Sequence, residues 1–142
     1  MPTIIETEVT FRDGMKFTGT SRSGKTVEID HIPGDVIPDG YSPLELLLAS
    51  LAGCSGQVVT GLLRRMGQDV RGLVVRAKGL KNDVHPRVFT SIELVFEFKG
   101  GRVDGPSVEN AFALSEDRFC PVWVMLKASV PITAKYRLAP SD

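Results

Sequence analysis

The chain has 142 residues, the length of one domain, and its 42% hydrophobic and 24% charged residues are an ordinary soluble composition. Seventeen basic residues balance 17 acidic residues, so the formal net charge of zero gives no electrostatic basis for binding nucleic acid or an anionic membrane. We therefore expect a single domain over residues 1–142. Its expected partners are small molecules or a second copy of the chain, with no nucleic acid and no membrane.

The first residues, Met1 to Glu6, show no basic segment followed by an apolar run. The absence of this secretory pattern predicts a cytoplasmic location. Two cysteines, Cys54 and Cys120, would normally stay reduced in that compartment. A permanent structural disulfide is disfavoured, which leaves buried spectator thiols or a redox pair.

Alternating apolar residues separated by turn residues mark the beginning of the chain. Ile5, Val9 and Phe11 alternate with polar residues before a turn at 12–14, and the alternation resumes after it. A second turn at 22–25 leads to a third apolar pair, Val27 and Ile29. This pattern predicts a three-stranded meander. Residues 32–41 hold two prolines and two glycines and are expected to form a loop, with Val36 and Tyr41 as possible pocket residues.

A long apolar helix is predicted from Ser42 to about Arg65. Ser42 is a good N-cap, Pro43 suits the first helical position, and Glu45 stands where a capping box needs an acidic residue. Leucines and valines point in every direction around this helix, which predicts burial over most of its circumference. By length the segment resembles a membrane span, but its polar residues and the surrounding sequence favour the core helix of a soluble α+β domain.

Strands and short helices are predicted for the second half. Strands are expected around residues 73–77, 91–99 and 132–138, and a helix from about 105 to Arg118. Pro121 then interrupts the chain and should begin a second short helix. Cys120 thus stands at a helix N-terminus, where the macrodipole and nearby Arg118 should lower the thiol pKa.

Neither histidine supports a metal centre. His31 and His85 have no metal-ligand spacing to each other or to a cysteine, so we expect no metal site and no bound cofactor. Cys54 lies in the middle of the apolar helix, where an isolated cysteine is usually a small hydrophobe. Its small neighbours Gly53, Ser55 and Gly56 leave access to the sulfur and keep a reactive role open.

Two segments carry a family resemblance. Ser42-Pro43-Leu44-Glu45-Leu46 through Ala52-Gly53-Cys54, followed later by Ser115-Glu116-Asp117-Arg118-Phe119-Cys120-Pro121-Val122, resembles the two cysteine motifs of the OsmC/Ohr superfamily, with the greatest likeness to its OsmC-like (YhfA-like) branch. The resemblance implies an α+β OsmC-like fold, with antiparallel sheets around a long central helix in an intertwined homodimer. It also implies that Cys54 is the peroxidatic residue and Cys120 the resolving one, and that an external dithiol reopens their disulfide.

The match to the family's activating residues is incomplete. The superfamily's catalytic glutamate stands ten positions before the first cysteine, and here that residue is Leu44. Glu45 is nine positions before Cys54, on the opposite side of a straight helix, so we interpret it as a capping residue that is catalytic only if the helix bends. The family's arginine has no assigned counterpart among Arg12, Arg22 and Arg118.

Two functions remain in competition. The first is a thiol-dependent hydroperoxide reductase that acts on organic or small peroxides through Cys54 and Cys120. The second is a non-peroxidase dimer that binds a small apolar molecule in an interface cavity, with the cysteines as redox sensors or packing residues.

Overall fold

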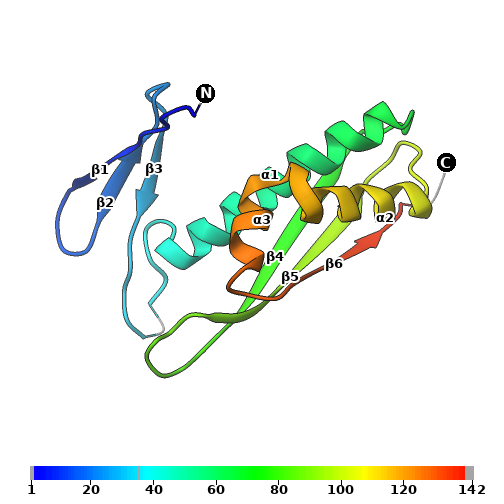
Figure 1. The fold of residues 1–142 in the computed structure, drawn as a ribbon. Coiled ribbons are helices and arrows are strands. Elements are labelled where there is room, and N and C mark those ends of the chain that lie inside the picture. Colours follow the sequence, from blue (N-terminus) through cyan, green and yellow to red (C-terminus); the bar gives the residue numbers. More distant parts are fainter. Residues whose placement is uncertain (1, 35, 140–142) are drawn as a thin grey trace. The chain divides into compact units, whose positions relative to one another are not determined.

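The computed structural model describes residues 2–34 and 36–139 (Figure 1). Contacts divide the chain into two compact units, Met1–Leu47 and Leu48–Asp142, and each unit is described by itself. The long helix α1, Pro43–Arg65, begins in the first unit and continues through the second. The α+β fold class expected from the sequence is confirmed.

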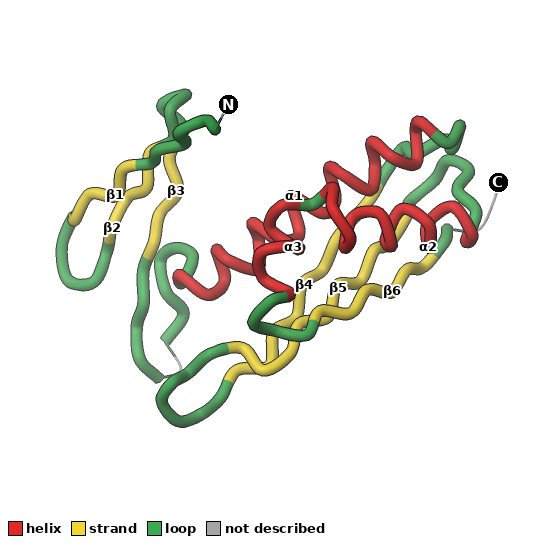
Figure 2. The backbone as a smooth tube through the Cα atoms, in the orientation of Figure 1, coloured by secondary structure: helices red, strands yellow, loops and turns green. Residues whose placement is uncertain are grey.

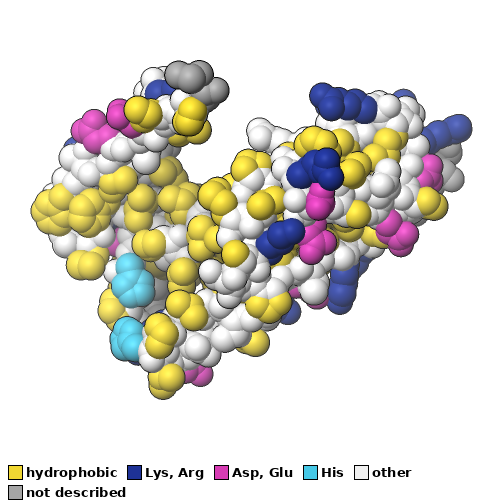
Figure 3. All heavy atoms as spheres, in the orientation of Figure 1, with side chains coloured by type: hydrophobic (Ala, Val, Ile, Leu, Met, Phe, Trp, Pro, Cys, Tyr) yellow, Lys and Arg dark blue, Asp and Glu magenta, His cyan; other side chains and the backbone are white. Residues whose placement is uncertain are grey.

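The first unit contains the predicted meander. Strands β1 (Glu8–Phe11), β2 (Phe17–Thr20) and β3 (Thr26–Ile29) form an antiparallel sheet in the order β1-β2-β3. Residues that are paired across the three strands point to the same face of the sheet. One of the two faces carries only apolar side chains and a glycine. Hydrophobic side chains at the surface of this unit are visible in Figure 3. None of the apolar side chains on that face is buried: Val9, Phe11, Phe17, Val27 and Ile29.

The loop before the long helix also follows the prediction. Tyr41 bridges to Ile29 and lines a shallow hollow with Glu28 and Glu45, whereas Val36 is 59% exposed and is not part of that hollow. At the start of α1, the backbone N–H of Ser42 donates to Oε1 of Glu45 at 2.9 Å, and the N–H of Glu45 donates to Oγ of Ser42 at 3.2 Å. The predicted capping box is therefore present.

The second unit places three helices on one face of a sheet. Strands β4 (Leu73–Lys81), β5 (Phe89–Phe98) and β6 (Ile132–Arg137) are joined in that order, and Figure 2 shows the helices on one side of them. Strand β6 runs parallel to β5, so the expectation of antiparallel sheets is wrong for this pair. The reason is that the chain between β5 and β6 crosses the sheet face through helices and returns to the same end.

The segment between β5 and β6 differs from the prediction in one turn. Helix α2 spans Gly105–Leu114 and α3 spans Pro121–Lys127, as expected, but Ser115–Phe119 forms a π-helical turn, η1. The turn is closed by the N–H of Cys120, which donates to the carbonyl of Ser115 at 3.0 Å. The wider turn ends the α-helix before Arg118, which was predicted to be its last residue.

The core of the second unit lies between this sheet and its helices. Strand β5 buries alternate side chains, and the ring of Phe96 lies 4.8 Å, centroid to centroid, from that of Phe112 in α2. Helix α1 contributes one buried row of side chains, spaced by four residues: Leu51, Ser55, Val59 and Leu63. The expectation that α1 is buried over most of its circumference is therefore wrong for the single chain, because only this row is buried and the rest of the helix is partly or fully exposed.

Candidate functional site

The structure brings the two cysteines together. Sγ of Cys120 lies 3.2 Å from Sγ of Cys54, within sulfur hydrogen-bond distance, although the residues are 66 positions apart in the chain. Both thiols are free. Two sulfurs at this distance need to approach by only about 1.2 Å to reach the S–S length of a disulfide, about 2.05 Å.

Local structure fixes Cys120 on its side of the pair. Asp104 caps α2 by accepting the N–H of Ser107 at 2.8 Å, and the π-turn then carries the chain to Cys120. The buried hydroxyl of Ser115 donates to the carbonyl of Ala111 at 2.7 Å and anchors the start of that turn. Pro121 begins α3 directly after Cys120, whose own backbone is extended. The sulfur is thus held between two helical segments of different pitch.

The two cysteines differ in how deeply they are buried. Cys120 is 0% exposed, whereas Cys54 is partly exposed on α1. Burial, followed by the hydrogen bond with Cys54, raises the pKa of the Cys120 thiol to about 11, while the N–H groups of Trp123 and Val122 act in the opposite direction. The expectation of a lowered pKa at this helix N-terminus is wrong, because desolvation of the thiolate outweighs the dipole of a helix of only seven residues.

Three of the charged residues considered from the sequence, Arg118, Glu45 and Arg12, each form a hydrogen bond with another residue. Arg118 donates from Nε to Oδ2 of Asp117 at 2.6 Å and its side chain is 68% exposed, so this contact binds the guanidinium that was expected to assist Cys120. Glu45 is held in the capping box, and the hydrogen bonds of Ser42 lower its pKa. In the first unit, Arg12 donates from Nε to the hydroxyl of Thr18 at 3.0 Å.

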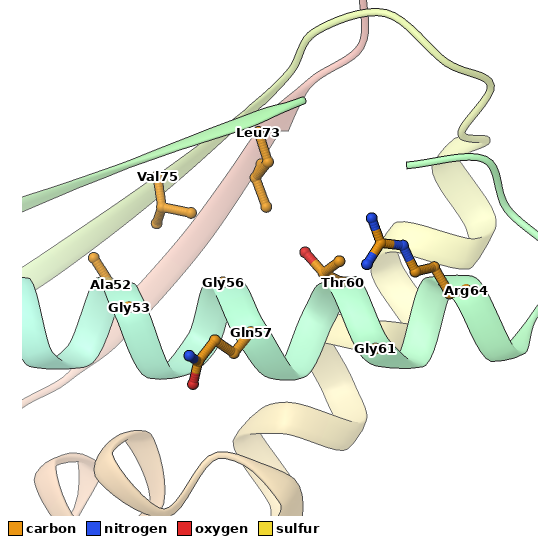
Figure 4. Close-up of a pocket in the computed structure, with 9 residues that line it drawn as sticks. All are labelled: Ala52, Gly53, Gly56, Gln57, Thr60, Gly61, Arg64, Leu73 and Val75. Atoms are coloured by element: carbon orange, nitrogen blue, oxygen red, sulfur yellow. The ribbon is translucent and has the colours of Figure 1, made fainter. Parts of the chain in front are cut away.

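The sequence did not predict a groove along α1. Figure 4 shows it between the helix and two side chains of β4, Leu73 and Val75. Its volume is about 600 Å³ and its helical wall consists mostly of small residues. The sequence signal for this wall was the set of closely spaced alanine and glycine residues. The lining residues from α1 are Ala52, Gly53, Gly56, Gln57, Thr60, Gly61 and Arg64.

The sequence matches a known family over most of its length. The family described as OsmC-like protein matches residues 34–135. Protein YhfA of Escherichia coli (strain K12) is 33% identical over 134 residues, which cover 94% of this chain and 98% of YhfA. These matches agree with the resemblance carried by the two cysteine segments.

Solved structures share the fold. A hypothetical protein from Aquifex aeolicus VF5 superposes with a TM-score of 0.86 at 25% identity, covering 99% of both chains. An organic hydroperoxide resistance protein from Elizabethkingia anophelis superposes with a TM-score of 0.70 at 17% identity, covering 98% of this chain and 100% of that one. At that identity the second likeness concerns the fold alone.

Proposed function

The chain belongs to the OsmC-like protein family, and on this premise we propose that it is a thiol-dependent hydroperoxide reductase whose redox pair is Cys54 and Cys120. The observation that carries the proposal is the 3.2 Å separation of the two sulfurs. Redox chemistry of this kind needs a thiol that a peroxide can reach and a second thiol beside it. The partly exposed Cys54 and the buried Cys120 meet these two requirements.

In the first step, the Cys54 thiolate attacks the terminal oxygen of the hydroperoxide. The O–O bond breaks, the sulfur becomes a sulfenic acid, and the alkoxide leaves and takes up a proton to give the alcohol. Cys54 has this role because it is the partly exposed residue of the pair, whereas Cys120 is completely buried. Organic or small peroxides are the proposed substrates.

In the second step, Cys120 attacks the sulfenic sulfur of Cys54. The Cys120 thiol first loses its proton, its thiolate forms the S–S bond, and the hydroxyl group leaves as hydroxide, which takes up a proton to give water. The raised pKa of Cys120 keeps this thiol protonated near neutral pH, so the buried sulfur is protected from direct oxidation until the sulfenic acid forms beside it. An external dithiol then restores the reduced pair.

We propose that the protein works as a homodimer. The apolar face of the first sheet has no buried side chain, and only 22% of the most apolar stretch of α1 is buried in the single chain. Exposed apolar surface of this extent marks an association surface. The glycines Gly53 and Gly61 face open space on the exposed side of α1 and allow another backbone to approach.

Helix α1 is also long and apolar enough to span a membrane, by length and composition alone. The core helix of a soluble protein passes the same test. The family match includes this helix, and the proposed second copy would cover its apolar surface, which supports the interpretation as a core helix. A cytoplasmic location is proposed on the same grounds.

The groove along α1 supports a second candidate function. A small apolar molecule in this groove would contact Leu73 and Val75, while the cysteines serve as sensors or packing residues. Neither cysteine lines the groove. A ligand of this kind would raise the melting temperature of Cys54→Ser as much as that of the wild type, since binding does not need the thiol.

Catalytic turnover separates the two functions. Consumption of cumene hydroperoxide is followed in the presence of excess dithiothreitol, with wild type, Cys54→Ser and Cys120→Ser compared at equal concentration. The reductase proposal expects turnover by the wild type and a loss to the uncatalysed rate in Cys54→Ser. Full turnover by Cys54→Ser would reject the proposal.

A further inference from the structure

We propose that a dithiol reopens the oxidised pair by attacking Sγ of Cys54, with Cys120 as the leaving sulfur. This inference rests on the proposed function, which supplies the Cys54–Cys120 disulfide. A disulfide between two cysteines offers two sulfurs to an incoming thiolate, and the products differ in which residue first carries the reductant. The structure distinguishes the two cysteines by the exposure of the residue.

Access favours Cys54. Cys54 is a partly exposed residue on α1. Cys120 is 0% exposed and belongs to a core that also contains Trp123 at 2%. The incoming thiolate approaches in line with the S–S bond, from the side of the attacked sulfur that faces away from its partner. An enclosed sulfur offers that path only if the surrounding core opens.

The same difference in exposure should persist after oxidation. The two sulfurs are 3.2 Å apart in the reduced protein and move together by about 1.2 Å to form the bond. A displacement of that size is smaller than one side-chain rotamer change. We therefore expect Cys54 to remain the partly exposed residue of the disulfide and Cys120 to remain the buried one.

The chemistry balances over two exchange steps. First, one thiolate of the dithiol bonds to Sγ of Cys54, the Cys54–Cys120 bond breaks, and its electron pair leaves with Cys120, which takes up a proton. Second, the other thiol of the reductant loses its proton and attacks the reductant sulfur bonded to Cys54. The reductant leaves as a cyclic disulfide and Cys54 leaves as a thiolate. Two electrons pass from the dithiol to the protein pair.

Two effects oppose each other in the first step. The raised pKa of Cys120 makes it a slow leaving group, which would favour attack on Cys120 instead. Access has the larger effect. A poor leaving group slows the attack on Cys54, whereas the enclosed sulfur of Cys120 cannot be attacked at all while the core stays closed. The released Cys120 also stays beside the mixed disulfide and can close the original bond again. A monothiol adduct is therefore short-lived and must be trapped by rapid quenching, whereas the second thiol of a dithiol completes the reduction.

The test locates the first adduct on the wild-type protein. Reduced protein is oxidised with diamide rather than a hydroperoxide, so the disulfide does not depend on peroxidase activity. The oxidised protein is mixed briefly with excess 2-mercaptoethanol, quenched with acid and digested. Trypsin cuts after Arg118 and Lys127, so the nine-residue peptide carrying Cys120 is separated from the peptide carrying Cys54. Protein unfolded in urea before mixing is the control.

We expect the mercaptoethanol adduct on Cys54 to exceed that on Cys120 by at least about tenfold in the folded protein, and the two to be similar in urea. Equal adducts in the folded protein, or more adduct on Cys120, would overturn the inference. Failure of diamide to join the two cysteines would overturn it as well. An adduct on Cys54 in a protein that does not turn over hydroperoxide would uphold the site of attack and reject only the reductase function.

Discussion

Cys54 and Cys120 are in sulfur contact at 3.2 Å, yet Cys54 is a partly exposed residue and Cys120 is completely buried. The contact makes a disulfide geometrically easy. In the proposed mechanism the asymmetry divides the chemistry, because reagents reach Cys54 and only Cys54 reaches Cys120. Each of the following predictions tests one part of this arrangement or of the fold that supports it.

The raised pKa of Cys120 predicts a pH-dependent second step. Attack on the sulfenic acid needs the thiolate, and below pH 11 the thiolate fraction of Cys120 grows tenfold per pH unit. Conversion of the sulfenic acid to the disulfide, followed with enough hydroperoxide to make the first step fast, should therefore accelerate about 100-fold between pH 7 and pH 9. Acid quenching and mass spectrometry give the rate. A rate that levels off near pH 8 would show an ordinary thiol pKa.

The capping box predicts a structural role for Glu45. Because Glu45 and Ser42 exchange hydrogen bonds, Glu45→Ala and Ser42→Ala should each lower the free energy of unfolding by about 0.5–2 kcal/mol, measured by urea titration. Peroxide turnover per folded molecule should stay the same in both. Ser42→Ala is the matched control, since it removes the cap and keeps the carboxylate. Turnover lost in Glu45→Gln but kept in Ser42→Ala would instead assign a catalytic role to Glu45.

On the exposed side of α1, a larger side chain at Gly61 should stabilise a monomer but weaken a dimer. A methyl group added at Gly61 meets nothing within 4 Å in the single chain, so Gly61→Ala should stabilise an isolated monomer by about 0.4–1 kcal/mol. If a second copy covers this face closely, the same methyl group weakens association. We expect sedimentation equilibrium to show a weaker dimer for Gly61→Ala. A more stable protein with unchanged association would place the dimer contact elsewhere.

Gly79 in β4 predicts a packing defect. A Cβ at this position would overlap the ring of the buried Phe89 in the neighbouring strand. Gly79→Ala should therefore cost about 1–3 kcal/mol of unfolding free energy, as overpacking does in other cores. Adding Phe89→Leu in the same chain should recover part of that loss, because the smaller side chain leaves room. Equal stability of Gly79→Ala and wild type in urea would contradict this packing.

Much of the fold followed from local sequence signals. Turn residues and alternation predicted the meander and β5, and Ser42, Pro43 and Glu45 predicted the start of α1. These signals act between near neighbours in the chain. The parallel pairing of β6 with β5 was not predicted, because it depends on how the whole helical segment crosses the sheet. The π-turn was missed because it is only five residues long, at the end of α2, and so short a segment contains too few apolar residues to show a change of period.

The site was predicted only in part. Resemblance to a family suggested that Cys54 and Cys120 act as a pair, and their contact fits that suggestion. Local reasoning gave the wrong direction for the Cys120 pKa, because it considered the helix dipole and could not include burial by distant residues. The same limit applies to Arg118, whose partner Asp117 is adjacent in sequence but whose orientation depends on the π-turn.

The most direct test of the redox pair is a single oxidation without reductant. Reduced wild type, Cys54→Ser and Cys120→Ser each receive one equivalent of cumene hydroperoxide, and free thiols and protein mass are followed over time. We predict that the wild type loses both thiols within seconds and forms the intramolecular disulfide. Cys120→Ser should stop at a sulfenic acid that dimedone traps, and Cys54→Ser should keep its thiol. Oxidation of the wild type no faster than that of an ordinary free thiol, or equal oxidation of Cys54→Ser, would contradict the account.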